Sequence, residues 1–141
     1  MRTVLSQLVV PALAGLLLAT SGCGGGADGG DGTALEEMEW TLLAGSEAPP
    51  DAVPTVTFAN GTVSGFSGCN QYGGDYELER DAIAIGEIAV TAMACPDQEM
   101  EAEESCLAAF LEVDGRSLGD GELVLSAAGD EVLRYKPRAG R

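Results

Sequence analysis

The sequence lacks histidine and has few basic residues. Its 141 residues include seven lysines and arginines against 23 aspartates and glutamates. The missing histidine excludes Ser-His-Asp and Cys-His catalysis, HExxH zinc sites and imidazole proton shuttles. Carboxylates and lysine can still perform acid–base chemistry, so an enzyme is disfavoured rather than excluded. We therefore expect no catalytic residues, no metal site and no cofactor.

The shortage of positive charge also limits the partners. A nucleic-acid binder needs a clustered basic face, and this chain, with a formal charge of −16, has none. Its negative field also repels anionic phospholipid and lipopolysaccharide, so a membrane contact would have to come from acyl chains. We interpret the acidic residues as a solvated surface, and a cationic partner is the alternative.

No apolar run is long enough to span a bilayer. The longest, Leu8–Ala19, falls short of the roughly 20 residues that a spanning helix needs. It follows Arg2 and precedes the small residues Thr20–Gly22, and this order is typical of an export signal. We therefore expect residues 1–22 to be a signal peptide that is removed.

The residue after this segment, Cys23, resembles the cysteine of a bacterial lipobox. The resemblance implies cleavage after Gly22, a diacylglycerol thioether on Cys23 and acylation of the new amino terminus. Thr20 departs from the leucine that a lipobox usually has three residues before the cysteine. Gly24 in place of aspartate favours the outer membrane, facing the periplasm. Ordinary signal cleavage with a free Cys23 thiol is the alternative.

Residues 23–34 are expected to form a lipidated, flexible tether. The stretch Gly24–Thr33 is rich in glycine and aspartate and has no apolar side chain larger than alanine, so it can bury nothing. A folded domain is therefore expected over residues 35–137, long enough for one hydrophobic core.

Most of this domain has the patterns of β-strands. Asn60-Gly61 is the strongest hairpin signal, because both residues tolerate positive φ. A closing hairpin is predicted around Gly129-Asp130, and further turns at Arg80-Asp81 and at Gly86. The predicted strands lie around Trp40 and at 55–58, 62–66, 75–79, 82–85, 87–90, 122–126 and 131–136.

One segment after Pro96 predicts a helix instead. Asp97 is expected to cap it, and the glutamates that follow would suit the positive end of its dipole better than a metal site. Met100, Leu107 and Phe110 with Leu111 are predicted to form its apolar stripe. The expected fold is α+β, a small and mostly antiparallel sheet or partly closed barrel with one α-helix packed on it.

Two sequence blocks carry a resemblance to a known family. These are "GCNQYGGDYEL" from Gly68 and "TAMACPD" from Thr91. Together with Trp40 and the Asn60-Gly61 hairpin they resemble the META domain family, which includes HslJ-like lipoproteins. Ala92 departs from the basic residue common in relatives, and Cys106 is an additional cysteine. The glycines of the first block and Gly65 are expected to permit sharp turns or close backbone approaches.

The cysteines of the two blocks are candidates for a disulfide. Cys69 lies in the first block and Cys95 in the second, and an exported protein folds in an oxidising compartment. A Cys69–Cys95 bridge is the preferred pairing. A bridge between Cys106 and Cys95 and three free thiols remain as alternatives, and Cys106 could also be a buried thiol beside Ala102 and Phe110.

The resemblance implies an exported, often lipidated domain linked to envelope stress, without an agreed biochemical activity. We therefore expect a monomeric, non-enzymatic lipoprotein of the cell envelope that contacts the membrane through Cys23 and binds an envelope protein or a lipid. A protease inhibitor or pilot-like secretion chaperone is the alternative from another class. A carboxylate-based hydrolase is a further one, and it would need two acids that face each other in a cleft.

Overall fold

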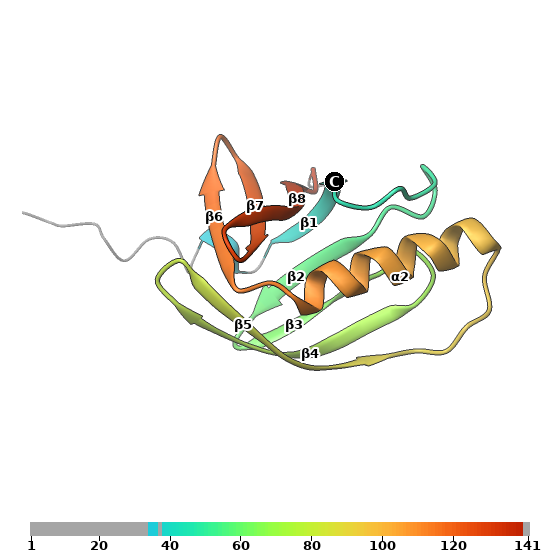
Figure 1. Cartoon of the computed structure of the whole chain (residues 1–141), viewed down its shortest axis with the longest axis horizontal. Coiled ribbons are helices and arrows are strands. Elements are labelled where there is room, and N and C mark those ends of the chain that lie inside the picture. Colours follow the sequence, from blue (N-terminus) through green and yellow to red (C-terminus); the bar gives the residue numbers. More distant parts are fainter. Residues whose placement is uncertain (1–33, 37, 140–141) are drawn as a thin grey trace, which may run out of the picture.

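A computed structural model describes residues 34–36 and 38–139, so the predicted signal peptide, Cys23 and most of the predicted tether lie outside the described residues. Strands β1 to β8 follow one another around a ring in chain order, each antiparallel to its neighbour, and β8 pairs with β1 (Figure 1). Helix α2 crosses the ring, and its presence beside the sheet confirms the α+β class. The elements are β1 Glu39–Ala44, β2 Thr55–Ala59, β3 Thr62–Phe66, β4 Gln71–Glu79, β5 Ala82–Val90, α2 Asp97–Leu111, β6 Gly115–Gly119, β7 Glu122–Ala127 and β8 Asp130–Pro137.

Tight turns with two residues at positive φ join several of the strands. Asn60 and Gly61 have φ of 52° and 78°, which confirms the predicted hairpin between β2 and β3. Such turns match the twist of the strands that they join. The last hairpin turns at Ala128 and Gly129, one residue earlier than predicted.

Strands β4 and β5 are longer than the sequence predicts. Gly86 does not form a turn but lies within β5, and Gly73 and Gly74 lie within β4. A shift in register between Gly74 and Tyr76 lets β5 bulge there and continue without a turn. Strand β6 was not predicted, because it is short and has a glycine at each end.

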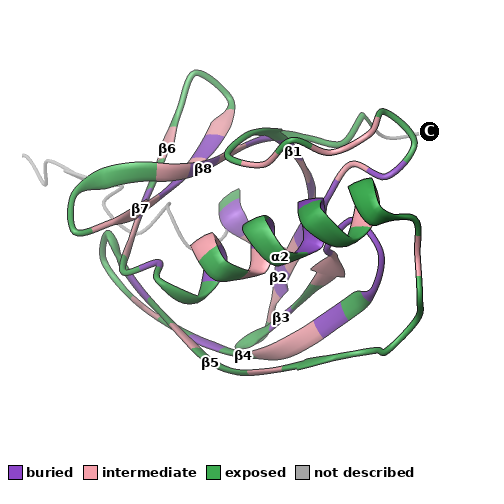
Figure 2. Cartoon of the chain, turned by 45° about the vertical axis from the view of Figure 1, so that its right-hand side comes forward, coloured by how far each residue is buried: buried purple, intermediate pink, exposed green. Residues whose placement is uncertain are grey.

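The ring is not a regular barrel, because β5 and β6 meet at one end only. Their register has the single pair Ala82 with Gly115, whereas the other neighbouring strands pair over several residues. Helix α2 connects these two strands and lies over the open side of the ring (Figure 2). The sheet alone therefore does not enclose the core.

The core lies between the inner faces of the strands and the buried face of α2. Phe110 of the helix packs against Tyr72 of β4 with ring centroids 5.5 Å apart, and Phe58 meets Tyr76 edge-on at 5.0 Å. The Trp40 indole donates to the Leu35 carbonyl over 3.1 Å. The buried apolar residues of this cluster are Leu35, Trp40, Leu42, Val56, Phe58, Val63, Tyr72, Tyr76, Ile83, Phe110, Val113, Leu123, Leu125, Leu133 and Tyr135.

Helix α2 buries a face that matches the predicted stripe only in part: Phe110 is buried and Leu107 packs partly buried against the core, as predicted, but Met100 and Leu111 do not. Its buried residues are Ala102, Glu103, Cys106 and Phe110, whereas Met100 and Leu111 are 40% and 57% exposed. Small side chains at Ala102 and Cys106 let the helix approach the ring closely, which long side chains at those positions would prevent.

The start of α2 also differs from the prediction. Its N-cap is Pro96, no side chain caps it, and Asp97 is its first helical residue. The predicted Asp97 cap was therefore wrong, although Asp97 and Glu99 do place negative charge in the first turn, where it stabilises a helix. Among residues 34–36 and 38–139, no helix is long and apolar enough to cross a bilayer.

Neighbouring glycines of β4 provide a matched test of close backbone packing. A β-carbon at Gly74 would overlap the Glu87 carbonyl oxygen and approach Ile88 Cδ1 to 2.7 Å, whereas one at Gly73 would meet nothing nearer than 3.6 Å. We predict that Gly74→Ala lowers the free energy of unfolding by about 2–4 kcal/mol, measured by urea denaturation. Gly73→Ala should change it by less than about 1 kcal/mol; equal losses would contradict this account.

Candidate functional site

The first sequence block begins with a buried bend between β3 and β4. Ser67, Gly68, Cys69 and Asn70 are all buried, and the Ser67 N–H donates to the Asn70 carbonyl over 2.9 Å. Gly68 has φ of 117°, and a β-carbon there would lie 3.3 Å from Ala102 Cβ on α2. The bend therefore packs directly on the helix, and at this position the predicted need for glycine is confirmed.

The side-chain amide of Asn70 links this bend to the second block and to α2. Its Oδ1 accepts from the Met93 N–H over 2.6 Å and from the Thr91 hydroxyl over 2.9 Å. Its Nδ2 donates to Glu103 Oε1 over 2.9 Å and lies 3.4 Å from the Met93 carbonyl oxygen. Both ends of the amide are thus satisfied, as a buried polar group requires.

Glu103 accepts the remaining hydrogen bonds of the bend. Its Oε2 lies 2.5 Å from the Ser67 hydroxyl and 2.7 Å from the Asn70 backbone N–H. Burial raises the pKa of the Glu103 carboxyl, but the hydrogen bonds from Ser67 and Asn70 outweigh this effect, and the pKa lies below its ordinary value. Glu103 is therefore a buried anion that is held by hydrogen bonds and not by a cation.

A disulfide joins the two blocks beside this network. Cys69 and Cys95 are bonded with their Cα atoms 5.9 Å apart, which confirms the preferred pairing. The bridge closes a loop of 26 residues and should stabilise the fold by about 3.5 kcal/mol on the chain-entropy model. Cys106 is the free cysteine of the described residues, and burial raises the pKa of its thiol to about 11. It is therefore a protonated core residue and no nucleophile.

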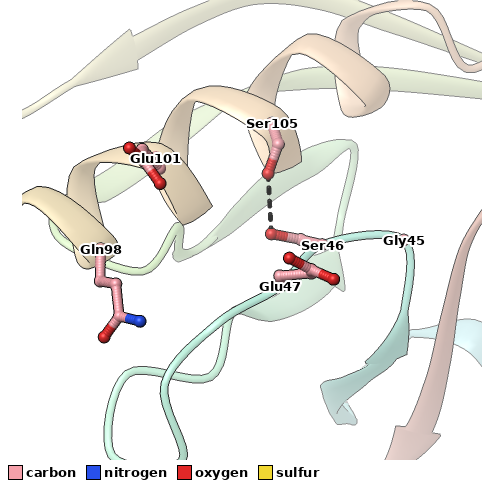
Figure 3. A pocket seen from close by; sticks show the side chains of 6 residues that line it. All are labelled: Gly45, Ser46, Glu47, Gln98, Glu101 and Ser105. Carbon is pink, nitrogen blue, oxygen red and sulfur yellow. Dashed lines mark hydrogen bonds between the residues drawn. The ribbon is translucent and has the colours of Figure 1, made fainter.

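A separate surface pocket lies between α2 and the loop after β1 (Figure 3). Ser46 holds this loop to the helix, with its hydroxyl 2.9 Å from the Ser105 hydroxyl and 3.0 Å from the Ala102 carbonyl oxygen. Glu47 and Glu101 contribute carboxylates to the pocket. Nowhere in the described residues do three potential ligands gather in a way that could hold a metal ion.

The network joins the two blocks on which the sequence resemblance depends. Comparison with known proteins finds the same family. The sequence model of the META domain matches residues 33–140. The chain belongs to the META domain family. A search of curated proteins finds no match.

Solved structures show the same fold. An NMR structure of a protein from Burkholderia xenovorans is 25% identical to this chain, with a TM-score of 0.64 over 77% of this chain and 86% of that one. A second NMR structure, 22% identical, has a TM-score of 0.55 over 75% of this chain and 93% of that one, and it supports the fold alone. The shared fold thus accounts for most of each solved chain.

Sequence reasoning found only part of this site. It placed Cys69 and Cys95 together, but it counted Glu103 among the glutamates that follow Asp97 at the positive end of the helix dipole. Glu103 lies in the helical register of the buried Ala102, Cys106 and Phe110, and this spacing was the signal that could have identified it. The lipidation residue Cys23 lies outside the described residues, so its role stays a prediction.

Neighbouring glutamates of α2 test the network. Glu103→Gln would place an amide N–H against the donors of Ser67 and Asn70, and we predict a loss of about 2–4 kcal/mol in the free energy of unfolding. Glu104→Gln, at an exposed position, should change it by less than about 0.5 kcal/mol. Urea denaturation at neutral pH measures both, and equal effects would contradict a structural role for Glu103.

The same variants give a distinct pH dependence. Because the folded pKa of Glu103 is lowered, its stabilising contribution is complete above the ordinary value of 4.5 and is lost as the pH falls through the lowered folded value. We predict that the melting temperature of Glu103→Gln falls less than that of the unaltered chain between pH 6 and more acid conditions. A parallel fall in both proteins would show that Glu103 does not titrate in this range.

Proposed function

We propose that this META domain protein is a lipid-anchored component of the cell envelope that binds another protein and catalyses no reaction. The observation that carries the proposal is the inward direction of the polar network. Glu103, Asn70 and Ser67 satisfy one another, and their atoms hold segments of the fold together. A general base must instead be able to reach a proton of the substrate.

The hydroxyls of Tyr72 and Tyr76 are likewise occupied by the fold. The Tyr72 hydroxyl donates to the Thr55 carbonyl over 3.0 Å, and the Tyr76 hydroxyl lies 2.5 Å from Glu36 Oε1. Burial, together with this hydrogen bond, raises the pKa of Tyr76 to about 12. Such groups are suited to fixing a structure and poorly suited to exchanging protons near neutral pH.

The anchor is proposed from the lipobox-like sequence before Cys23. Its acyl chains would hold the protein at the membrane by burying methylene groups, each worth about 0.8 kcal/mol. The domain itself contributes little attraction to anionic lipid, because Arg116 is buried while Arg134 and Arg138 form ion pairs with glutamates. We also propose a role in envelope stress, and this part of the proposal rests on the family resemblance alone.

The anchor is tested by the mass and the location of the protein. In its native host, the full chain should fractionate with membranes, and its intact mass should correspond to cleavage before Cys23 plus three acyl chains. Cys23→Ser should release the protein into the soluble fraction because both processing and lipidation need the thiol. Cys106→Ser is the matched control and should stay in the membrane. A soluble, unmodified native protein would overturn the anchor.

A further inference from the structure

The outer edge of β5 has no strand beside it for most of its length. Among the described residues, β6 pairs with β5 only at Ala82, and the backbone bonds at this junction end with the Ile83 N–H to the Asp114 carbonyl. We call Ala84–Val90 the β5 edge. In Figures 1 and 2 β5 forms the border of the ring, and β6 meets it at one end.

The direction of the backbone on this edge follows from its last bond to β4. The Thr91 N–H donates to the Gln71 carbonyl over 3.0 Å, so Thr91 faces β4. Successive residues of an antiparallel strand direct their N–H and C=O groups to opposite sides. Val90 and Ile88 therefore present their backbone groups away from β4, where no described residue bonds them.

The β5 edge also has few of the features that usually protect an edge strand. Its sequence, within "AIAIGEIAV", contains one charged residue, Glu87, and neither lysine nor proline. The bulge opposite Asp75 interrupts it once, and the part that follows ends with Val90, which is 40% exposed. An apolar strand with unpaired backbone groups is a template for another strand.

An exposed apolar side chain on a fixed backbone adjoins the end of this edge. Met93 is 61% exposed, yet its backbone is bonded to Asn70 on both sides and lies two residues from the disulfide at Cys95. Asn70 also bonds Glu103, which lines a groove with Met100 and Leu107 of α2. Because the backbone at Met93 is already fixed, a partner that binds there need not order it.

The charges around this surface select the partner. The groove that contains Met100 is lined by Asp97, Glu101 and Glu104 and by no basic residue. The described arginines and the lysine lie elsewhere, in the β4–β5 turn, on β6 and at β8 with the residue after it. A second copy would carry the same charge of −16 and be repelled. A basic partner would be attracted.

We propose that the β5 edge and Met93 dock an extended, basic segment of a partner protein, which adds as a strand beside Ile88 and Val90. The inference rests on the proposed binding function and names its surface and the chemistry of its partner. Backbone hydrogen bonds would hold the segment, its apolar side chains would meet Met93, and its lysines or arginines would face the acidic groove.

Amide exchange with a defined peptide tests this docking. The probe is a short peptide of alternating lysine and valine, added to residues 24–141. This part of the chain is expected to fold on its own, because the matching region makes up 86% of the solved Burkholderia xenovorans protein. We expect the Ile88 and Val90 amides to exchange quickly in the free protein and to become protected on binding. The Thr91 amide, already bonded to β4, should be protected in both states.

Three comparisons make the result specific. Val90→Pro removes the outward N–H and should weaken binding at least about tenfold, whereas Val90→Thr keeps the N–H and the branched shape and should bind within about twofold. A peptide N-methylated on its pairing edge should lose binding to the unaltered protein, which keeps the test decisive if Val90→Pro does not fold. A glutamate–valine peptide should not bind.

Several outcomes would overturn the proposal: no protection at Ile88 and Val90, equal binding of the N-methylated or the glutamate peptide, or protection that rises with protein concentration alone, which would mean a second copy. Because residues 24–141 lack the anchor cysteine, these results do not depend on lipidation. A failure of the proposed lipid anchor would be detected only in the mass and fractionation experiment.

Discussion

The fold depends on a buried, ionised carboxylate that is stabilised by hydrogen bonds and not by a counter-ion. An unpaired charge in a protein interior is costly, so Glu103 can stay ionised only while Ser67 and Asn70 remain in place around it. Asn70 in turn fixes the backbone at Met93. The bend, the second block and α2 therefore form one cooperative unit, in which the loss of one partner leaves the others unsatisfied.

This unit compensates for the incomplete closure of the ring. Since β5 and β6 share one register pair, α2 must cover the core where a strand ladder does not. The disulfide ties the segment before α2 to the bend, and Glu103 ties the helix itself to the same bend. Phe110 can then pack on Tyr72, further along the helix. Covalent, polar and apolar contacts thus fix α2 at successive positions along its length.

The sequence predicted the clearest turn and the link between the two blocks, but not the partners of the buried polar groups. The Asn60-Gly61 hairpin follows from local φ preferences, and the Cys69–Cys95 pairing from two short blocks. The helical spacing of Glu103 with Cys106 and Phe110 indicates that it is buried, but its partner Asn70 lies 33 residues away, and no local pattern encodes that contact. Gly86 was assigned to a turn because glycine often marks one, yet here the β4 ladder holds it in an extended strand with a bulge.

The open edge of β5 raises the question of what would keep copies of the chain from pairing through it. Edge strands are usually protected by lysine, proline or a covering segment, because an exposed one pairs with other chains. Here the protection comes from outside the strand. A charge of −16 spread over the chain repels other copies before their edges can align. The same negative charge attracts a basic segment. The net charge can therefore disfavour self-pairing and still leave the edge open to a partner of opposite charge.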